Sequence, residues 1–453
     1  MITRLEIDGF KSLRDFAIDL GPFTVLVGPN SAGKSNILEA LALLSCLASE
    51  PIEPAFKHGR GRAIDQFTLE KGEPVRSIRF AAELFLPADV DVRGVATNRL
   101  RYELTIGRER RASGTEALVV EHERLATIPE ERDTWIKLHS TQAERVRHAP
   151  EMDLFRQVER SSSGDSKRGY RRLLVGENRV FVLADNRTVP AFFRAELAPN
   201  ITHMSLFRSF ARALALALGA FRLVHLDSAR PREESERIGG DTLAPDASNL
   251  PTVLAALPPD VLGEIRADLV GLVPGISTFE VVADRDSFRI DFELSGGDRL
   301  PARLVSDGTL RALALLTALR SDRGPSTIAI EEPENGIYPG RLRTLLDLLR
   351  EATETPGSAP PESHAPSLEE AGEEEPTVSA PPQLLLTSHS PVVVAALRDD
   401  PGCLRFIDMV RRNGHLSTRA RPVGTPAAGE RGTMVPLREV DALLSLATTE
   451  AAE

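Results

Sequence analysis

The sequence predicts an α/β fold, a phosphate-binding core interrupted by an inserted antiparallel β region and a helical or mixed lobe. Two observations predict the core. The motif GPNSAGKS stands between an apolar strand and a helix near the start of the chain, and two late apolar strands end next to acidic or histidine residues. A run of alternating strand-like segments between them predicts the insertion. The expected parts are a core of residues 1–50 and 300–453, a β-rich lobe at 51–190 and a helical or mixed lobe at 191–299.

The composition excludes several classes of protein. Of the 453 residues, 42% are hydrophobic and 27% are charged, which is typical of a globular chain and excludes collagen-like or wholly disordered ones. No run approaches the roughly 18 apolar residues that span a bilayer, and the opening MITRLEIDGF alternates as a strand does, unlike a signal peptide. We therefore expect a cytoplasmic protein without a membrane partner.

The net charge of −11 is unevenly spread along the chain. Residues 352–382 contain seven glutamates and no lysine or arginine, are rich in Pro, Ser and Ala, and lack aromatic residues. Such a segment cannot bury enough apolar surface to offset its ordering entropy, so we predict a disordered acidic insertion within the core. Residues 51–190 hold slightly more basic than acidic residues. The overall acidity therefore does not exclude a local nucleic-acid surface.

Cysteine usage predicts neither a disulfide framework nor a CxxC metal site. The two cysteines, Cys46 and Cys403, lie far apart in the sequence. We expect both to be small, buried apolar residues.

Hydrophobic periodicity predicts the elements around the motifs. The expected strands are 2–8, 23–27, 76–86, 99–106, 117–124, 178–184, 277–283, 287–294, 327–330 and 383–387. The expected helices are one that follows the phosphate-loop motif, and then 203–219, 249–272, 307–320 and 339–352. The sequence shows no internal repeat and no sustained heptad pattern, which predicts that long coiled-coil arms are absent.

Residues 28–35 satisfy the phosphate-loop pattern G-x-x-x-x-G-K-[ST] in its required context, with a strand before it and a helix after it. Its two glycines let the backbone wrap the phosphates, so that N–H groups and the helix N-terminus point at the anion. Lys34 then reaches the β- and γ-phosphates and Ser35 is a ligand of Mg²⁺. The predicted phosphate-binding residues are Gly28, Pro29, Asn30, Ser31, Ala32, Gly33, Lys34, Ser35 and Asn36.

The apolar strand at 327–330 ends in two adjacent acids, Glu331 and Glu332, followed by Pro333. A phosphate loop needs a carboxylate on a neighbouring strand to hold the metal and, if it hydrolyses ATP, a base to orient water. Since ligands bind at the carboxyl ends of strands in open α/β sheets, we predict Glu331 as a Mg²⁺ ligand and Glu332 as the catalytic base. Taken alone, the two acids are explained about equally well as a pair of solvated surface charges at a turn and as a metal ligand with a catalytic base.

Two further segments carry candidate residues. The strand at 383–387 leads to His389, and although a single histidine near a strand end is more often a surface or core residue, its neighbours favour a functional role. At 305–316, in VSDGTLRALALL, Ser306 or Asp307 can cap a helix and Gly308 exposes backbone N–H groups, which suits an anion. From its residues alone, a well-capped amphipathic helix is the simpler interpretation of this second segment.

In this order, the motifs resemble those of the ABC-type ATPase heads of the RecF, SMC and OLD group, and in particular the stand-alone bacterial ATPases of the AAA_21 kind. The matching motifs lie at 1–41, 304–345 and 383–397, with a weaker similarity at 220–255. The resemblance implies a P-loop NTPase fold of the ABC-ATPase type and an enzyme that hydrolyses ATP with Mg²⁺. It makes Ser306, Asp307, Gly308 and Thr309 the signature motif, Glu334, Asn335 and Gly336 the D-loop, and His389 the switch histidine that contacts the γ-phosphate.

The chain departs from the family pattern at some positions. Members often carry a histidine before the proline where this sequence has Tyr338, a change that we expect to alter packing and not hydrolysis. Gln66 lies in the broad region of the Q-loop, but no local pattern supports that role. The segments 226–235 and 248–257 look like family features without an evident function.

The resemblance also implies a mode of assembly. In this class two heads pair head to tail, and ATP lies between the phosphate loop of one head and the signature motif of the other. We therefore expect a homodimer with two composite ATP sites. OLD-type nucleases carry an additional TOPRIM domain, and nothing in this sequence fits it, since the segment after His389 has no DxD motif and Asp399, Asp400 and Asp408 look like solvated charges.

Two functional alternatives stay open at this point. In the first, the ATPase acts on DNA, in repair or in defence against foreign DNA, often through a separate effector nuclease. In the second, it is an ATP-gated scaffold or sensor without DNA, whose slow hydrolysis times a protein interaction. The basic clusters at 57–62 and 108–111 favour the first alternative only weakly, because solvated loops explain them at least as well.

Overall fold

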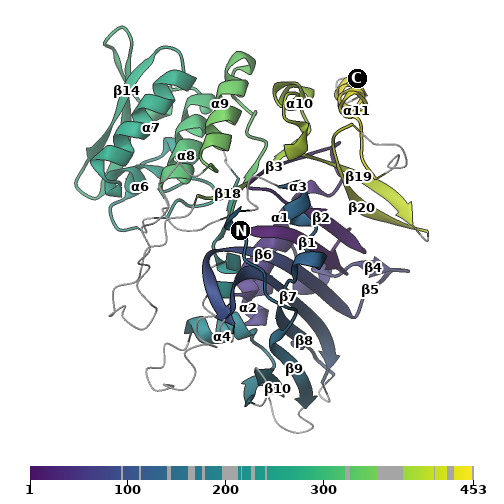
Figure 1. The fold of residues 1–453 in the computed structure, drawn as a ribbon. Helices are drawn as coiled ribbons and strands as arrows, with labels where there is room; N and C mark the ends of the chain where they lie inside the picture. The colour runs from purple at the N-terminus through teal and green to yellow at the C-terminus, as the bar shows by residue number, and fades with distance from the viewer. Residues whose placement is uncertain are drawn as a thin grey trace. The chain divides into compact units, whose positions relative to one another are not determined.

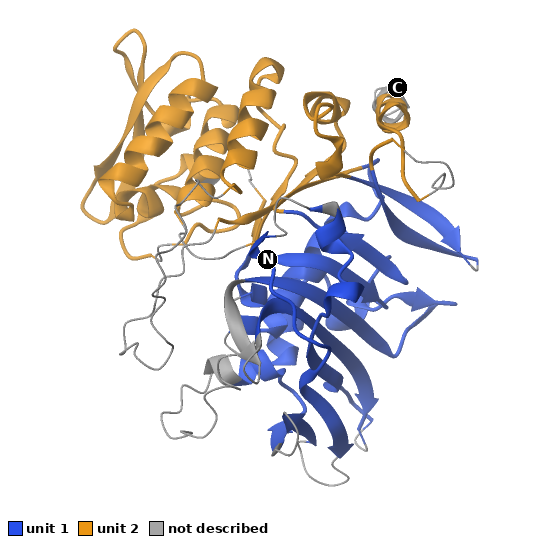
Figure 2. Ribbon diagram, viewed as in Figure 1, with its two compact units in different colours: residues 1–21, 28–221, 405–422 blue, residues 22–27, 222–404, 423–453 orange. Residues whose placement is uncertain are grey.

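The computed structural model divides into two compact units, which we describe separately (Figure 2). Unit 1 comprises residues 1–21, 28–221 and 405–422, and unit 2 comprises residues 22–27, 222–404 and 423–453. The structure describes residues 1–92, 95–111, 114–139, 144–161, 169–175, 179–195, 213–215, 217–225, 230–239, 242–321, 327–354, 381–412, 414–425 and 433–450.

Unit 1 is built on an antiparallel sheet of eight strands (Figure 1) in the order β11-β10-β9-β8-β7-β6-β1-β2. In β1, Leu5 and Ile7 are buried while Arg4 and Glu6 are half-exposed, the alternation expected of a sheet with one covered face. The bounds are β1 (Ile2–Asp8), β2 (Phe16–Asp19), β6 (Ser77–Val92), β7 (Val95–Arg110), β8 (Glu116–Thr127), β9 (Asp153–Ser161), β10 (Tyr170–Val175) and β11 (Arg179–Ala184).

Unit 1 also holds two hairpins and the helix that follows the phosphate-loop motif. That helix, α1, buries Ile37, Leu38, Leu41 and Leu44, the periodicity from which it was predicted. The remaining strands are β4 (Leu69–Glu70), β5 (Glu73–Pro74), β19 (Leu404–Arg412) and β20 (His415–Pro422). The helices are α1 (Lys34–Leu47), α2 (Ile52–Ala55), α3 (Trp135–Leu138) and α4 (Val189–Ala195), with the 3₁₀ helices η1 (Phe56–His58), η2 (Ala63–Gln66) and η3 (Glu130–Arg132).

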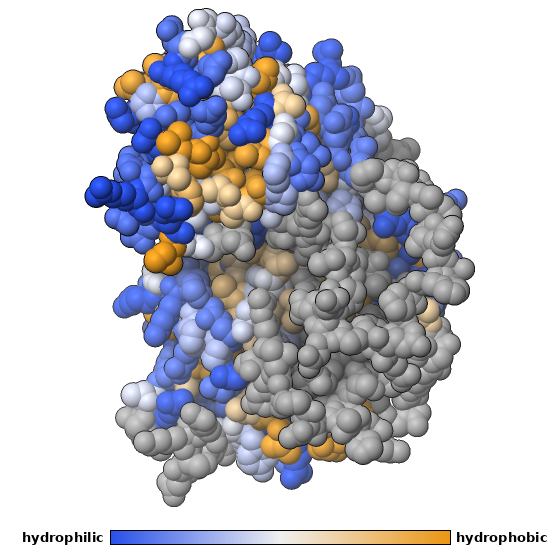
Figure 3. All heavy atoms as spheres, turned by 90° about the vertical axis from the view of Figure 1, so that its left-hand side faces the viewer, coloured by the Kyte–Doolittle hydropathy of each residue, from blue (hydrophilic) through white to orange (hydrophobic). Residues whose placement is uncertain are grey.

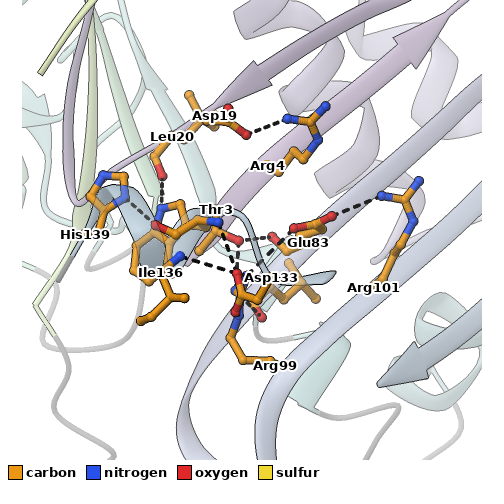
Figure 4. A network of polar contacts seen from close by, with 12 residues as sticks. Thr3, Arg4, Asp19, Leu20, Glu83, Arg99, Arg101, Asp133, Ile136 and His139 are labelled. Carbon is orange, nitrogen blue, oxygen red and sulfur yellow. Dashed lines mark hydrogen bonds and ion pairs between the residues drawn. The ribbon is translucent and has the colours of Figure 1, made fainter. Parts of the chain in front are cut away.

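A buried ion pair joins several elements of unit 1 (Figure 4). Both Arg99, on β7, and Asp133, just before α3, are inaccessible to solvent, and Nε and Nη2 of Arg99 lie 2.6 and 2.9 Å from the two carboxylate oxygens. Nη1 of Arg99 donates to Thr3 on β1 and to the carbonyl of Leu84 on β6. The indole Nε1 of Trp135 donates to the carbonyl of Leu20 at 2.7 Å. Because every charged atom has a partner, the network holds β1, β6, β7 and α3 in one arrangement.

Unit 2 contains three parallel strands in the order β17-β18-β3, with β12 (Phe221–Val224) next to β17. The strands are β3 (Phe23–Val27), β17 (Thr327–Glu331) and β18 (Gln383–Ser388). All residues of β3 and β18 are buried, as are the first four of β17. Continuous apolar runs of this kind are typical of parallel strands that are covered on both faces.

Helices and a small antiparallel sheet complete unit 2. The sheet has the order β13-β15-β14, and β16 also pairs with β15. Helix α8 packs beside α6 and α7 (Figure 1), and α9 is amphipathic, with Leu342, Leu345, Leu346 and Leu349 buried. The bounds are β13 (Ser235–Glu236), β14 (Ile276–Ala283), β15 (Ser287–Leu294), β16 (Arg299–Pro301), α6 (Leu250–Ala256), α7 (Pro259–Leu272), α8 (Asp307–Arg320), α9 (Pro339–Glu351), α10 (Pro391–Ala396) and α11 (Leu437–Glu450), with the 3₁₀ helices η5 (Arg230–Arg232), η6 (Ala302–Leu304) and η7 (Pro401–Cys403).

Every strand predicted from periodicity is present, and helices α1, α8 and α9 lie where they were expected. One prediction is wrong in part, because the helix expected at 249–272 is two helices, α6 and α7. They are separated at Leu257 and Pro258, where the proline ring is incompatible with a continuous helix. The strands that were not predicted are β2, β4, β5, β9, β10, β12, β13, β16, β19 and β20.

Some predictions fall on residues that the structure does not describe. Of the acidic insertion, residues 355–380 lie outside the described part, as do residues 203–212 and 216 of the helix expected at 203–219. Residues 213–215 and 217–219 of that helix are helical. The predicted boundaries of the core and the two lobes stay predictions.

Within the described residues, we find no helix with the length and hydropathy needed to cross a bilayer. On the face drawn in Figure 3, hydrophobic residues form separate patches between hydrophilic ones. The large hydrophobic side chains most exposed in unit 2 are those of Ile238, Leu304 and Tyr338.

Candidate nucleotide-binding site

The phosphate loop lies in unit 1 and has the backbone that an anion-binding loop requires. Ser31 and Gly33 both have positive φ, 62° and 96°, and Gly33 is the N-cap of α1. A Cβ atom on Gly33 would lie 2.0 Å from the Thr418 hydroxyl, so only glycine fits there. Gly33 has no side-chain acceptor of its own for the first N–H groups of α1, the arrangement that helix N-termini use to bind phosphate.

Two further contacts shape the loop. A Cβ atom on Gly28 would lie 2.1 Å from the carbonyl oxygen of Ile407 on β19, so this glycine is required by close packing. The side chain of Lys34 is buried, and its Nζ donates to the carbonyls of Gly28 and Pro29 at 2.7 and 2.9 Å. The loop therefore closes around the lysine that was predicted to reach the phosphates.

Ser12 and Thr418 pack against the phosphate loop at Gly33, and sequence analysis did not find them. The two hydroxyl oxygens lie 2.7 Å apart, and the backbone N–H of Thr418 donates to the carbonyl of Ser12. Asn36, one of the predicted phosphate-binding residues, donates from Nδ2 to the Ser12 hydroxyl at 2.7 Å. No local pattern could have joined Ser12 and Thr418, which are 406 positions apart in the chain.

In unit 2, the three parallel strands end at the same level. In the register of the sheet, Glu331 at the end of β17 pairs with Thr387 on β18. Ser388, at the end of β18, pairs in turn with Val27, the last residue of β3. The chain continues from Val27 directly into the phosphate loop at Gly28. Within unit 2, the strand-end acids, the residues around His389 and the end of β3 thus follow one edge of one sheet.

Glu331 is mostly buried and contacts a histidine that sequence analysis missed. Nδ1 of His225, which follows β12, lies 2.7 Å from Oε2 of Glu331. His225 lies beside the segment 226–235 that was noted without a role. The signal that could have found it is the position of a histidine just after a short strand, which is weak by itself.

Glu332 adopts an unusual backbone conformation. Its φ is 49°, in the left-handed region that only glycine adopts without cost, and its N–H donates to the carbonyl of Thr387 at 2.9 Å. Oε1 of Glu332 lies 2.8 Å from Nδ1 of His389, and Oε2 accepts from Nδ2 of Asn335 at 2.6 Å. Backbone strain of this kind persists where surrounding contacts enforce it, and it aims this carboxylate at His389.

Glu334 links the D-loop segment to the strand before His389. Its Oε1 accepts a hydrogen bond from the hydroxyl of Ser388, and that hydroxyl oxygen also accepts from the N–H of Ser390 at 2.9 Å. Burial raises the pKa of Glu334, with a further increase from the nearby Glu332, and the Ser388 hydrogen bond only partly opposes it. The loops that carry Glu332 and His389 are thus joined twice, by Glu332–His389 and by Glu334–Ser388.

The predicted signature residues begin α8. Ser306 is the N-cap, and its hydroxyl oxygen accepts from the N–H of Thr309 at 3.2 Å. Arg232, on η5, forms an ion pair with Asp307 through Nε, at 3.1 Å, and through Nη2. Nη1 of Arg232 donates to the carbonyls of Arg303 and Val305 at 3.0 and 2.9 Å. One guanidinium therefore binds both the turn that precedes the helix and the first turn of the helix.

The signature and D-loop segments touch through two glycines. A Cβ atom on Gly308 would lie 1.8 Å from the carbonyl oxygen of Gly336, whose own φ is 77°. The close approach explains a glycine at both positions.

The structure groups the predicted site residues as follows. In unit 2, Glu331, Glu332, Glu334, Asn335 and His389 lie around the carboxyl ends of β17 and β18, and Gly336 joins them to the signature segment. The phosphate-loop residues lie in unit 1.

Three other residues that the sequence analysis considered are Gln66, Tyr338 and Asp408. Gln66 is buried and donates from Nε2 to the carbonyl of Phe56, which gives no support for a Q-loop role. Tyr338 is 74% exposed. The expectation of a solvated charge is wrong for Asp408, which is largely buried between Arg419 and Arg421. Although burial opposes the shift, hydrogen bonds and charge from these two arginines lower the pKa of Asp408.

A phosphate loop after a parallel strand, with acids and a histidine at the ends of neighbouring strands, defines a P-loop NTPase head of the ABC-ATPase type. Residues 23–395 match the AAA_21 family, described as "AAA domain, putative AbiEii toxin, Type IV TA system". The match covers more than half of the chain, which therefore belongs to this family. The resemblance inferred from the motifs is confirmed.

Shorter segments are similar to curated relatives. The chain is 48% identical over 44 residues, 10% of its length, to the OLD nuclease of Thermus scotoductus, and 36% identical over 76 residues, 16% of its length, to the DNA replication and repair protein RecF of Paenarthrobacter aurescens. It is 37% identical over 83 residues, 16% of its length, to RecF of Vibrio vulnificus. The matched segments span 8%, 19% and 23% of these relatives, so the chain covers less than a quarter of each.

Solved structures of SMC heads are similar to the chain at low identity. An SMC head domain from Thermotoga maritima is 13% identical, with a TM-score of 0.38, over 94% of this chain and 99% of that chain. An Smc head with a coiled coil and joint from Pyrococcus yayanosii is 14% identical, with a TM-score of 0.45, over 99% of each chain. An Smc head bound to the C-winged helix domain of ScpA is 13% identical, with a TM-score of 0.48, over 93% of this chain and 98% of that chain.

Proposed function

We propose that this chain binds Mg-ATP and hydrolyses it to ADP and phosphate, as an ATP-gated dimer with two composite sites. The observation that carries the proposal is the register of β17, β18 and β3, which end level with one another. Through it, Glu331, Glu332 and His389 follow the same sheet edge at which the chain enters the phosphate loop. This is the arrangement that a P-loop ATPase needs to surround a nucleotide's phosphates.

The phosphate loop would bind the triphosphate. The N–H groups of residues 30–36, which include the N-terminus of α1, would face the phosphates, and Lys34 would exchange its two carbonyl partners for phosphate oxygens. The hydroxyl of Ser35 and the carboxylate of Glu331 are the hard oxygen ligands that Mg²⁺ prefers, so the donor set fits this ion. Bound there, Mg²⁺ would neutralise charge on the β- and γ-phosphates.

Glu332 and His389 would carry the hydrolytic step. The Glu332 carboxylate would orient a water molecule for attack on the γ-phosphorus and take up its proton, while ADP leaves with the β-phosphate oxygen. His389, held 2.8 Å from Glu332, would contact the γ-phosphate and keep that carboxylate in position. Glu332 is held by His389 and Asn335 together, which limits its motion.

The signature segment would act on the nucleotide of a second copy of the chain. Ser306, Asp307, Gly308 and Thr309 begin α8, where an N-terminal turn can face an anion. In the dimer, ATP would join the phosphate loop of one head to the signature of the other, and loss of the γ-phosphate would release them. Glu334, Asn335 and Gly336 would line the dimer interface next to the signature.

We further propose that the ATPase acts on DNA, in repair or in defence against foreign DNA, with a separate effector such as a nuclease. The relatives that share its segments include an OLD nuclease and a DNA replication and repair protein. The basic clusters support this weakly, since Arg60, Arg62 and Arg108 are each paired with a carboxylate. The alternative, an ATP-gated scaffold or sensor without DNA, is an outcome of the same experiment.

The test is steady-state ATP turnover of the purified wild type and Glu332→Gln, with and without duplex DNA at two salt concentrations. We expect the variant to bind ATP and to lose at least about a hundredfold in turnover, the usual contribution of a general base. Turnover that rises with DNA in a salt-sensitive way would support action on DNA.

The matched control is Glu280→Gln, which alters an exposed carboxylate on β14 in the same unit. It should hydrolyse ATP at the wild-type rate. Turnover that needs Glu332 but ignores DNA would favour the scaffold alternative. Unchanged turnover in Glu332→Gln would show that Glu332 is not the base.

A further inference from the structure

Cys46, Glu50 and His58 form a cluster of three different metal-ligating side chains in unit 1, away from the phosphate loop. One ligand atom from each side chain lies within 4.8 Å of the other two. Nε2 of His58 lies 2.8 Å from Oε1 of Glu50. Sequence analysis had interpreted Cys46 as a small buried apolar residue, since its cluster partners have no recognisable motif spacing.

The scaffold around the cluster holds two of the ligands on one helix face. Cys46 lies in α1, and the N–H of Glu50 donates to the carbonyl of Cys46 at 2.9 Å. This continues the helical turn beyond the end of α1. Side chains four positions apart on a helical turn lie one above the other, so the thiol and the carboxylate point the same way.

The third ligand is held by buried packing. His58 ends η1, whose first residue, Phe56, is fully buried and stacks on Phe67 with 5.9 Å between ring centroids. Gln66 donates from Nε2 to the carbonyl of Phe56 at 2.7 Å. The backbone next to His58 is therefore fixed, although the imidazole itself is 63% exposed and accessible to an ion.

We propose that Cys46, Glu50 and His58 bind a divalent transition-metal ion of the zinc class. A thiolate, an imidazole and a carboxylate are the ligands that Zn²⁺ takes, and three protein ligands leave a fourth position for water. The same set suits Mg²⁺ and Ca²⁺ poorly, because these ions prefer oxygen ligands alone. The site is thus distinct in chemistry from the Ser35 and Glu331 pair.

Binding would exchange protons for the metal. Burial and, secondly, the neighbouring Glu50 carboxylate together raise the pKa of the Cys46 thiol to about 11, so the metal-free cluster keeps its thiol proton. When the ion binds, a sulfur–metal bond forms and the thiol proton leaves to solvent. The carboxylate and imidazole, now hydrogen-bond partners, would each turn a lone pair to the metal.

The metal would tie the end of α1 to η1. Helix α1 begins at Lys34 in the phosphate loop and reaches Cys46 three turns later. Fixing its far end would stabilise the helix that orients the loop, without touching the nucleotide.

The experiment is titration of the EDTA-stripped full-length protein with Zn²⁺, and with Co²⁺ read by its thiolate-to-metal charge-transfer absorption. We expect one ion per chain, with Cys46→Ala and His58→Ala each weakening Zn²⁺ binding by at least about a hundredfold. Cys46→Ala should also abolish the cobalt–thiolate absorption. Magnesium in excess should displace neither ion.

Cys403→Ala is the matched control, because it removes the other cysteine, which is buried in unit 2 and donates from Sγ to the carbonyl of Asp400. It should bind both metals as the wild type does. The proposal is overturned if Cys46→Ala binds Zn²⁺ like the wild type, or if the cobalt–thiolate absorption is lost in Cys403→Ala. Neither result depends on ATP hydrolysis.

Discussion

Glu332 and His389 face each other across two adjacent parallel strands, with 2.8 Å between Oε1 and Nδ1. They are 57 positions apart in the sequence, and each follows the carboxyl end of its strand, β17 or β18. The left-handed backbone at Glu332 is part of this arrangement, since it turns the chain directly after the strand. The pair is therefore set by strand register and by one strained residue.

The backbone strain at Glu332 predicts that glycine at this position gives a more stable protein than alanine. Both Glu332→Gly and Glu332→Ala remove the carboxylate, but only glycine adopts a φ of 49° without a steric cost. We expect the glycine variant to be more stable than the alanine variant by about 1 kcal/mol after allowing for the greater freedom of glycine in the unfolded chain. Urea denaturation of both variants measures the difference.

The same two substitutions at Asp347 provide the control. Asp347 lies within the helix α9 and is 45% exposed, so alanine should be more stable than glycine there by about 1 kcal/mol. The same order at both positions would show that Glu332 is not strained in solution.

The Gly308–Gly336 contact predicts that no side chain is tolerated at Gly308. In Gly308→Ala the new methyl group would overlap the carbonyl of Gly336, and the start of α8 would have to move away from the D-loop. We expect a loss of about 1–3 kcal/mol in the free energy of unfolding, the usual cost of overpacking, together with weaker ATP-dependent dimerisation. Denaturation and light scattering with ATP measure the two effects.

Gly263→Ala is the matched control for this substitution. Gly263 lies in helix α7 of the same unit, and a Cβ atom there meets nothing within 4 Å. The control should be as stable as the wild type or more stable by up to about 1 kcal/mol. A Gly308→Ala protein that matches Gly263→Ala in stability and dimerisation would contradict the close contact.

Arg232 is predicted to position the signature segment without touching the nucleotide. In Arg232→Ala, the turn before α8 loses its hydrogen bonds to the carbonyls of Arg303 and Val305, and Asp307 loses its ion pair. We expect ATP-dependent dimerisation to weaken by about tenfold or more, while ATP binding by the separate heads is unchanged. Sedimentation with ATP and a nucleotide-binding titration distinguish the two effects.

Two further substitutions sharpen this test. Arg232→Lys should not restore dimerisation, because one ammonium cannot bind both carbonyls and Asp307 as a guanidinium fork does. Arg299→Ala, which removes an exposed arginine paired with Glu280 in the same unit, should leave dimerisation intact. Normal dimerisation of Arg232→Ala would show that Arg232 contributes to folding and does not position the signature segment for dimerisation.

The raised pKa of Glu334 predicts a pH-dependent difference from Glu334→Gln. The folded state holds this proton more tightly than the unfolded state, where a glutamate titrates at about 4.3. The contribution of the Glu334 proton to stability is therefore complete below the unfolded-state pKa, and it is lost as the pH rises through the pKa of Glu334 in the folded state. We expect Glu334→Gln to gain stability relative to the wild type as the pH rises from about 4 to 7.

Melting temperatures of both proteins across that range measure the effect. A constant difference between them would show that Glu334 titrates alike in the folded and unfolded states. The opposite slope would mean that the carboxylate is stabilised by its surroundings, against the effect of burial.

The buried pair of Arg99 and Asp133 predicts a large loss of stability in unit 1. Asp133→Ala would leave a fully buried guanidinium without its carboxylate, at a cost of about 3–5 kcal/mol. Chemical denaturation measures the loss. The double substitution Arg99→Met with Asp133→Leu should recover much of it, since both charges of the pair are then removed.

Asp65→Ala is the comparison for this pair. Asp65 forms an exposed ion pair with Arg62 in the same unit, and solvent screens that pair. The variant should unfold close to the wild type. An equal loss of unfolding free energy in Asp65→Ala and Asp133→Ala would show that burial of the Arg99–Asp133 pair makes its removal no more destabilising than removal of an exposed pair.

Much of the candidate site could be predicted from the sequence because its signals are local. The phosphate-loop motif specifies spacing within eight residues, and the apolar runs of β3, β17 and β18 identify strands that are buried on both faces. Acids directly after such a strand lie at its carboxyl end by necessity. Motif order alone then indicated the family, which the match over residues 23–395 confirms.

The missed strands had weaker signals. Strand β2 has only four residues, and the hairpin of β19 and β20 follows a segment whose charges suggested solvent. In that hairpin, Asp408 is paired with Arg419 and Arg421, so charges that look solvated in the sequence neutralise one another. Pairing across strands is invisible to periodicity within one strand.

By itself, the sequence determined the position of the phosphate-loop motif and the buried strands that end in acids or lead to a histidine, because both depend on short, local patterns. Only the tertiary structure decided which side chains support them. His225 against Glu331, Arg232 against Asp307 and Ser12 against Thr418 are contacts between segments 75 to 406 positions apart. Such contacts depend on how sheets and helices pack, and no property of either segment alone specifies the other.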